Sequence, residues 1–136
     1  MKRTALIALT LAVGIVIGAF GNQILSAQQE PVKRTALLKT DLAGIEGKEG
    51  IMVMAELAAG AATGKHYHPG HEFAYVLSGS GTLEIEGKEP VTFKPGTIAH
   101  LTPKQVHNVK NTGKTPLKVL GFAIYEKGQP PVTPVK

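Results

Sequence analysis

Between residues 50 and 126, short apolar runs alternate with turn residues. The runs are rich in Val, Ile and Tyr, and Gly, Pro or Ser ends most of them, a pattern typical of the strands of a β-sandwich or barrel. We expect strands at 51–57, 73–77, 82–86, 91–93, 97–101, 106–109 and 117–125. No stretch after residue 35 shows an apolar stripe of helical period with caps, so the pattern predicts an all-β domain.

Three shorter segments suggest how the strands connect. Gly87-Lys88 separates two of the runs, which indicates a hairpin. Residues 32–42 could add an edge strand, either to this barrel or to that of a partner. The tail over 128–134 contains three prolines, and proline cannot donate to a strand ladder, so we expect the tail on the surface and outside any central strand.

The first 27 residues differ from the rest of the chain. A basic pair precedes an uncharged apolar run over 4–20, and this order is typical of a secretory signal. The run falls short of the ~20 apolar residues that a spanning helix needs. We therefore expect an apolar signal helix cleaved after Gly21 or Ala27, with an uncleaved membrane anchor as the alternative. In both cases the domain of residues 28–136 would be exported, to the periplasm or the cell exterior.

Composition narrows the classes of partner. The formal net charge of +5 includes Lys2 and Arg3 of the leader, and subtracting these two charges leaves +3. The other lysines are scattered singly, Trp is absent and there are only four Phe and three Tyr, so a nucleic-acid partner is not expected. The chain has no cysteine, which excludes disulfides and means that any metal is bound without thiolate.

All five histidines lie between residues 66 and 107, and this clustering is the strongest chemical signal in the chain. His66 and His68 are two apart, so on a strand both imidazoles would face the same side. Glu72 follows after a Pro-Gly turn, and a closed barrel could bring His107 opposite the first pair. Imidazole and carboxylate ligands suit divalent first-row metals, and burying these four groups would be costly unless a metal or a full hydrogen-bond network compensates.

The same residues resemble the two motifs of the cupin superfamily. The positions that match the first motif are Gly60, His66, His68, Glu72 and Gly79. The second motif is partly kept, at Gly96, His107 and Asn111. Thr102 and Lys104 depart from it, because they stand where the family usually has Pro and Gly. The motifs and the flanking strand pattern extend the resemblance to about residues 35–128.

The resemblance implies a small jelly-roll β-barrel, often a homodimer, with one divalent metal ion (Mn, Fe, Ni, Cu or Zn). The implied ligands are His66, His68, Glu72 and His107. A dioxygenase acting on a small organic substrate is the leading activity, and Glu72 could also carry a proton in it. The alternatives are a lyase or isomerase of small organic acids, a binding module without turnover, and a metal that only braces the barrel.

Strand alternation sorts the remaining candidates. His71 neighbours Glu72 and should point away from the site, whereas His100 is a candidate proton carrier if it faces the cavity. Near the ligands, the expected inward positions are Ala74, Val76 and Val109, an apolar wall that suits an uncharged or aromatic ligand.

The same alternation turns Phe73, Tyr75 and Leu77 outward, where they could form an interface or be covered by a second β-layer. Asn111 is expected to bond backbone groups in the turn after its strand. Gly60, Gly79 and Gly96 are expected in tight turns that only Gly enters without strain.

Overall fold

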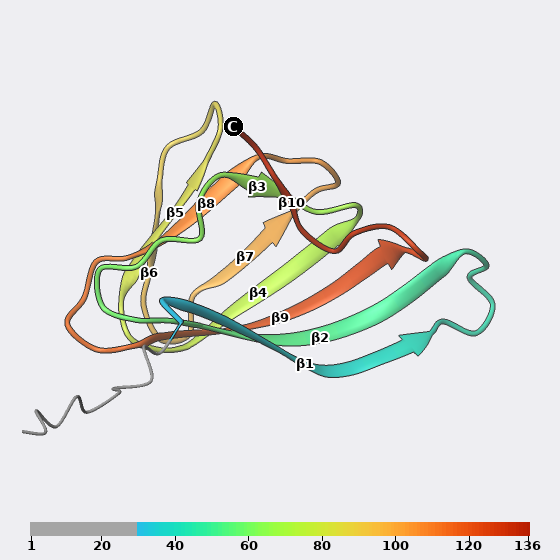
Figure 1. Ribbon diagram of the computed structural model, residues 1–136, viewed down its shortest axis with the longest axis horizontal. Helices are drawn as coiled ribbons and strands as arrows, with labels where there is room; N and C mark the ends of the chain where they lie inside the picture. The colour runs from blue at the N-terminus through green and yellow to red at the C-terminus, as the bar shows by residue number, and fades with distance from the viewer. Residues whose placement is uncertain (1–29) are drawn as a thin grey trace, which may run out of the picture.

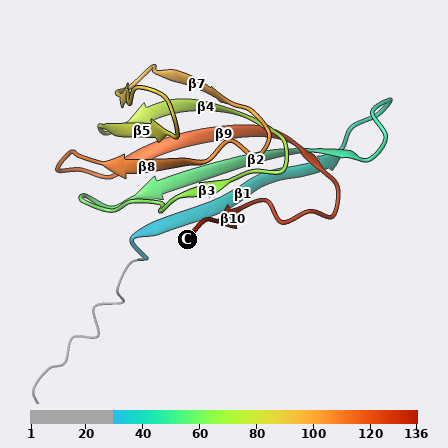
Figure 2. The same cartoon turned by 90° about the horizontal axis from the view of Figure 1, so that it is seen from above.

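The computed structural model describes residues 30–136, and within this range the chain is all-β and contains no helix. Two antiparallel five-stranded sheets lie face to face (Figures 1 and 2). In the described part of the chain, no helix is long and apolar enough to cross a membrane. The signal or anchor helix predicted for residues 1–27 lies outside the described residues.

The order of strands in each sheet is that of a jelly roll. The first sheet runs β1-β2-β9-β4-β7 and the second β10-β3-β8-β5-β6. The strands of the first sheet are β1 (Val32–Asp41), β2 (Lys48–Leu57), β9 (Leu117–Glu126), β4 (His71–Ser78) and β7 (Ile98–Leu101). Those of the second are β10 (Thr133–Pro134), β3 (His66–Tyr67), β8 (His107–Asn111), β5 (Gly81–Ile85) and β6 (Val91–Phe93). Strands far apart in the sequence are thus neighbours in space, and the chain crosses repeatedly between the sheets.

Alternation of apolar and polar residues explains how the strands close around a core. In β9 every second side chain, from Leu117 to Tyr125, is buried, and those between are exposed or half-buried. Hydrophobic burial therefore favours one face of β9. The core lies between the two sheets, because both contribute its largest fully buried side chains. These are Leu57, Val76 and Leu117 from the first sheet and Leu83 and Phe93 from the second.

The predicted strands are confirmed, with ends that differ by a few residues. The edge strand expected over 32–42 is β1 (Val32–Asp41), which is paired with β2 on one side. The hairpin around Gly87 joins β5 to β6. The tail stays out of the central strands as expected, but it adds the two-residue edge strand β10 beside β3, where Thr133 pairs with Tyr67.

The motif glycines occupy the turns that were expected of them. Gly60, Gly79 and Gly96 all have positive φ, of 78°, 83° and 87°. Gly79 is the most constrained, because a Cβ there would lie 2.5 Å from the carbonyl oxygen of Pro116. Asn111 bonds backbone groups as predicted. Its Nδ2 donates to the carbonyls of Leu57 at 2.9 Å and Thr115 at 2.8 Å, and its Oδ1 accepts from Gly113 N–H at 2.9 Å.

The two departures from the second motif do not disturb its turn. Lys104 adopts the left-handed conformation, φ 59°, that the usual Gly would take. Its backbone N–H donates to the carbonyl of His68 at 2.8 Å. Thr102 is tied to Gln105 by its own N–H, which donates to Oε1 at 3.1 Å. The turn thus braces the backbone of a candidate ligand.

Candidate metal centre

The structure brings three histidines together between the sheets. His66 lies in β3, His68 directly after it, and His107 begins β8, where it pairs in register with His66. The ring centroids are 4.2 Å apart for His66–His107, 4.9 Å for His68–His107 and 5.0 Å for His66–His68. All three side chains are buried, and one nitrogen of each lies within 4.8 Å of the others. This group could hold a metal ion.

Hydrogen bonds fix which nitrogen of each ring is available. Every Nδ1 faces a backbone carbonyl, namely that of Gly64 for His66 (2.8 Å), Pro131 for His68 (2.7 Å) and Gln105 for His107 (2.9 Å). A carbonyl oxygen only accepts, so each Nδ1 carries the proton and donates it. In the neutral ring Nε2 then keeps a free lone pair, as a metal-bound imidazole requires. The donor set therefore fits a divalent first-row ion.

Glu72 lies beside this group, reached from β4. Its Oε2 is 3.3 Å from Nε2 of His68 and accepts a hydrogen bond of 2.5 Å from the hydroxyl of Tyr125. The carboxylate and the free lone pair of His68 both accept, so their proximity calls for a proton or a cation between them. The compact group of ligand atoms comprises the three histidines, with Glu72 at its side.

Tyr125 is a site residue that the sequence reasoning missed. It ends the buried alternation of β9, and its ring stacks on that of His68 with centroids 5.6 Å apart. Burial and the neighbouring Glu72 carboxylate raise the pKa of its phenol, so the hydroxyl stays protonated and serves as a donor. The inward side of β9 was predictable from alternation, whereas the meeting of β9 with β4 at this point was not.

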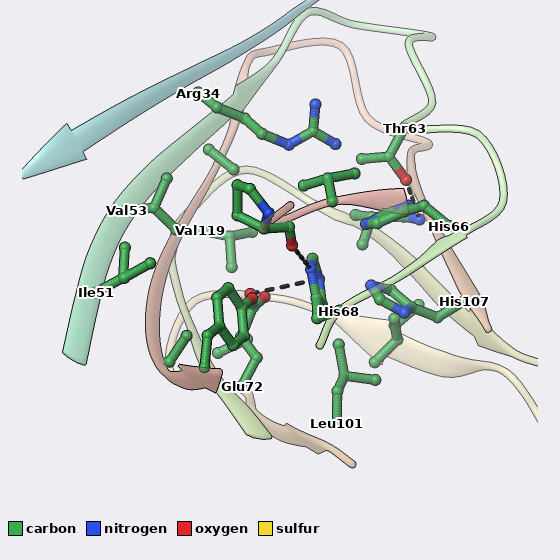
Figure 3. A pocket seen from close by; sticks show the side chains of 18 of the residues that line it. Arg34, Ile51, Val53, Thr63, His66, His68, Glu72, Leu101, His107 and Val119 are labelled. Carbon is green, nitrogen blue, oxygen red and sulfur yellow. Dashed lines mark hydrogen bonds and ion pairs between the residues drawn. The ribbon is translucent and has the colours of Figure 1, made fainter. Parts of the chain in front are cut away.

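A cavity of about 300 Å³ opens in front of the histidines (Figure 3). Ala74 and Val109 line it, as alternation predicted, while Val76 belongs to the packed core. The wall is not only apolar, however. Arg34 and Lys39 reach it from β1, and neither was considered as a site residue because the register of an edge strand cannot be read from its own sequence.

His71 and His100 stand apart from the buried cluster of three histidines. Both are exposed, and Nδ1 of His71 lies 3.0 Å from Nε2 of His100. The ring of His100 stacks on Phe73 with centroids 4.6 Å apart. Phe73 and His100 face each other in the β4–β7 register, which puts them on the outer face of the sheet. His71 thus points away as expected. The geometry does not support His100 as a proton carrier, because it faces out of the barrel and away from the cavity.

Burial also sets the charge of the candidate ligands. Burial above all, with a smaller contribution from nearby imidazoles, lowers the pKa of His66 and of His107 from 6.5 to about 4. The carbonyl bonds to Gly64 and Gln105 oppose this change only in part. Both rings are therefore neutral near pH 7, the state in which imidazole binds metal.

In metal-free protein, acidification from pH 6.5 towards 4 should lower the free energy of unfolding. Below pH 6.5 these two imidazoles become protonated in the unfolded chain, whereas the buried His66 and His107 of the folded protein stay neutral until about pH 4. Stability is thus fully present above 6.5, and the loss by pH 4 is on the order of 3 kcal/mol per imidazole. Denaturant titrations of chelator-treated protein would measure it, with His66→Gln showing a smaller loss. Equal pH dependence in both proteins would contradict the assignment.

Comparison with known proteins places the chain in a family. The Cupin domain model matches residues 53–125, more than half of the chain. Among curated proteins, the tetracenomycin polyketide synthase protein TcmJ of Streptomyces glaucescens is 31% identical over 72 residues, which cover 52% of this chain and 48% of TcmJ. The chain spans less than half the length of the curated relatives it matches.

Solved structures show the same fold at low identity. The polyketide cyclase RemF from Streptomyces resistomycificus superposes with a TM-score of 0.61 at 20% identity, covering 79% of this chain and 72% of RemF. The DMSP lyase DddQ from Ruegeria pomeroyi superposes with a TM-score of 0.64 at 17% identity, and the match covers 85% of this chain and 57% of DddQ. With two facing sheets, a buried histidine cluster and a family match over most of the strands, this chain belongs to the cupin superfamily.

Proposed function

We propose that this protein holds one divalent metal ion with His66, His68, His107 and Glu72, and that it catalyses a proton-transfer reaction of a small organic molecule in the cavity. The observation that carries the proposal is the orientation of the three imidazoles. All three Nδ1 atoms are committed to carbonyls, so the lone pairs left for a cation are those of Nε2. Glu72 would add the fourth ligand and the one negative charge.

Acid–base chemistry is favoured by the Tyr125–Glu72 pair. The sequence offered few reactive groups beyond Glu72, but the structure adds a buried phenol 2.5 Å from its carboxylate. A bound divalent ion would supply Lewis-acid polarisation of a substrate oxygen. Tyr125 orients the Glu72 carboxylate and holds a proton beside it, and Glu72 can take a proton from a substrate carbon or hydroxyl. This division of roles suits a lyase, an isomerase or a cyclase.

The names of two fold neighbours fit this class, since one is a polyketide cyclase and the other a DMSP lyase. The second candidate is a metal-dependent dioxygenase, the activity that the family resemblance first suggested. It is supported by the same ligand set and by the largely apolar lining of the cavity. The two candidates differ in one measurable respect, which is whether dioxygen is consumed during turnover.

Metal binding is tested by composition. The purified protein should contain about one divalent ion per chain, measured by elemental mass spectrometry, because the donor atoms form one group. His66→Ala combined with His68→Ala should abolish binding. The matched control is His71→Ala with His100→Ala, which removes the exposed pair and should leave metal content unchanged. Full metal content in the first double variant would show that the site is wrong.

The reaction class is tested by turnover with and without oxygen. Small organic acids and polyketide-like phenols, followed by NMR under anaerobic conditions, should be converted by the metal-loaded protein. Tyr125→Phe should lower turnover roughly 10- to 100-fold, the effect of losing a hydrogen bond to a charged group, with metal content retained. Stoichiometric oxygen uptake with catechols, flavonols or β-diketones would establish the dioxygenase instead. Binding without turnover of any of them would leave a ligand-binding module.

We also propose that two copies pair through the outer face of the first sheet. Two rows of residues cross this face in register: Leu38, Met52, Phe122, Phe73 and His100, and then Thr35, Met54, Leu120, Tyr75 and Ile98. His100 is the one ionisable group besides the Tyr75 phenol in these rows. Phe73, Tyr75 and Phe122 are each more than 40% exposed. Aromatic residues and methionine are enriched in interface cores, and this face can meet itself around a twofold axis without opposing like charges.

Light scattering should therefore give the mass of a dimer. Tyr75→Lys places a charge in the centre of the face and should shift the protein to a monomer, because pairing would bury two unpaired ammonium groups. Val91→Lys is the control, since Val91 is exposed on the second sheet and should leave the dimer intact. A monomeric parent protein at all concentrations would refute the pairing.

A further inference from the structure

We propose that Arg34 makes the cavity a site for small organic anions, carboxylates above all, with an apolar body. The inference rests on the proposed function in taking the cavity as the substrate site. It goes beyond that function in naming a class of substrate and the residue that selects it. It also replaces the expectation, drawn from an apolar wall, of an uncharged ligand.

The register of β1 turns Arg34 inward. Arg34 pairs with Ala55 of β2, and Ala55 pairs with Val119 of β9. All three residues line the cavity, so they share the inner face of the sheet. Figure 3 shows the guanidinium extending across the cavity towards Thr63, on the same side as His66. Arg34 is exposed and also lines the cavity, so a ligand in the cavity can reach its charged end.

The charge of Arg34 has no counterion in residues 30–136, which contain every acidic residue of the chain. The other cation at the cavity is already paired, because Nζ of Lys39 lies 3.2 Å from the buried carboxylate of Glu49. Glu72, the acid inside the site, is bonded to Tyr125 and lies beside His68. A guanidinium is always protonated, and its planar fork matches the two oxygens of a carboxylate.

The remaining wall selects the body of the ligand. The rest of the lining includes the aliphatic and aromatic residues Ala55, Leu83, Phe93, Val109 and Val119. A volume of about 300 Å³ is at the lower end for small-molecule sites. Arg34 is an exposed residue of β1, so solvent screens its guanidinium in part, and the apolar lining keeps the attraction to an anion in the cavity stronger than it would be in bulk water. The guanidinium, the apolar lining and the small volume together favour a ligand that is small, apolar at its centre and negatively charged at one end.

Calorimetric titration with benzoate and its neutral analogue benzamide tests this assignment. The metal-loaded protein should bind benzoate at least about 10-fold more tightly than benzamide. Arg34→Gln should weaken benzoate binding by about 10- to 100-fold, the effect of losing a hydrogen-bonded charge, and leave benzamide binding unchanged. Lys33→Gln is the matched control. Lys33 is the neighbouring cation on β1 and pairs with Glu56, on the opposite face of the sheet, so benzoate binding should not change.

A second set of titrations on chelator-treated protein separates this proposal from the metal site. If benzoate binding survives chelation and is lost in Arg34→Gln, Arg34 is the anion site, even if the metal assignment fails. If binding is lost on chelation but kept in Arg34→Gln, the carboxylate goes to the metal and the role of Arg34 is refuted, while the proposed function stands. Equal affinity for benzoate and benzamide, or no benzoate binding by the parent protein, would also refute it.

Discussion

Each of the three buried imidazoles donates its Nδ1–H to a backbone carbonyl, and the character of the site depends on these bonds. They choose the tautomer, fix the ring planes and leave Nε2 as the open nitrogen. Without them a buried neutral imidazole could turn its N–H into the cluster and offer no lone pair there. Burial keeps the rings uncharged, since it lowers the pKa of His66 and His107 to about 4. Orientation and neutrality together are what a cluster that could hold a metal ion requires.

The carbonyls come from segments that have no regular structure of their own, so the fold must hold these segments in place. Gly64 and Gln105 each lie two residues before the histidine they orient. Pro131 belongs to the C-terminal tail, which is fastened to β3 by the pairing of Thr133 with Tyr67. The N–H of Lys104 holds the backbone of His68 from the other side. The site is therefore braced from three directions, and the tail is part of it.

Spacing made the three histidines predictable because a strand repeats every two residues and a jelly roll brings β3 beside β8. The strands and their inward faces were predictable for the same reason. The contact between the Pro131 carbonyl of the tail and His68 was not predictable. The prolines of the tail indicate only that it cannot join a central strand. Arg34 depends on the β1–β2 register, which shifts at a bulge between Ala36 and Leu38. No local sequence pattern predicts that shift, so only the structure shows that Arg34 lines the cavity.

Charge balance connects the metal centre to the rest of the cavity. Three neutral imidazoles and one carboxylate supply a single negative charge, so a bound divalent ion would retain one unit of positive charge in front of an apolar wall. Arg34 adds another, and Lys39 does not, because Glu49 already neutralises it. Arg34 is exposed and solvent screens its charge in part, but the apolar lining makes these charges act more strongly on a ligand in the cavity than they would in bulk water. A site built this way is electrostatically incomplete, and a small anion with an apolar body would complete it.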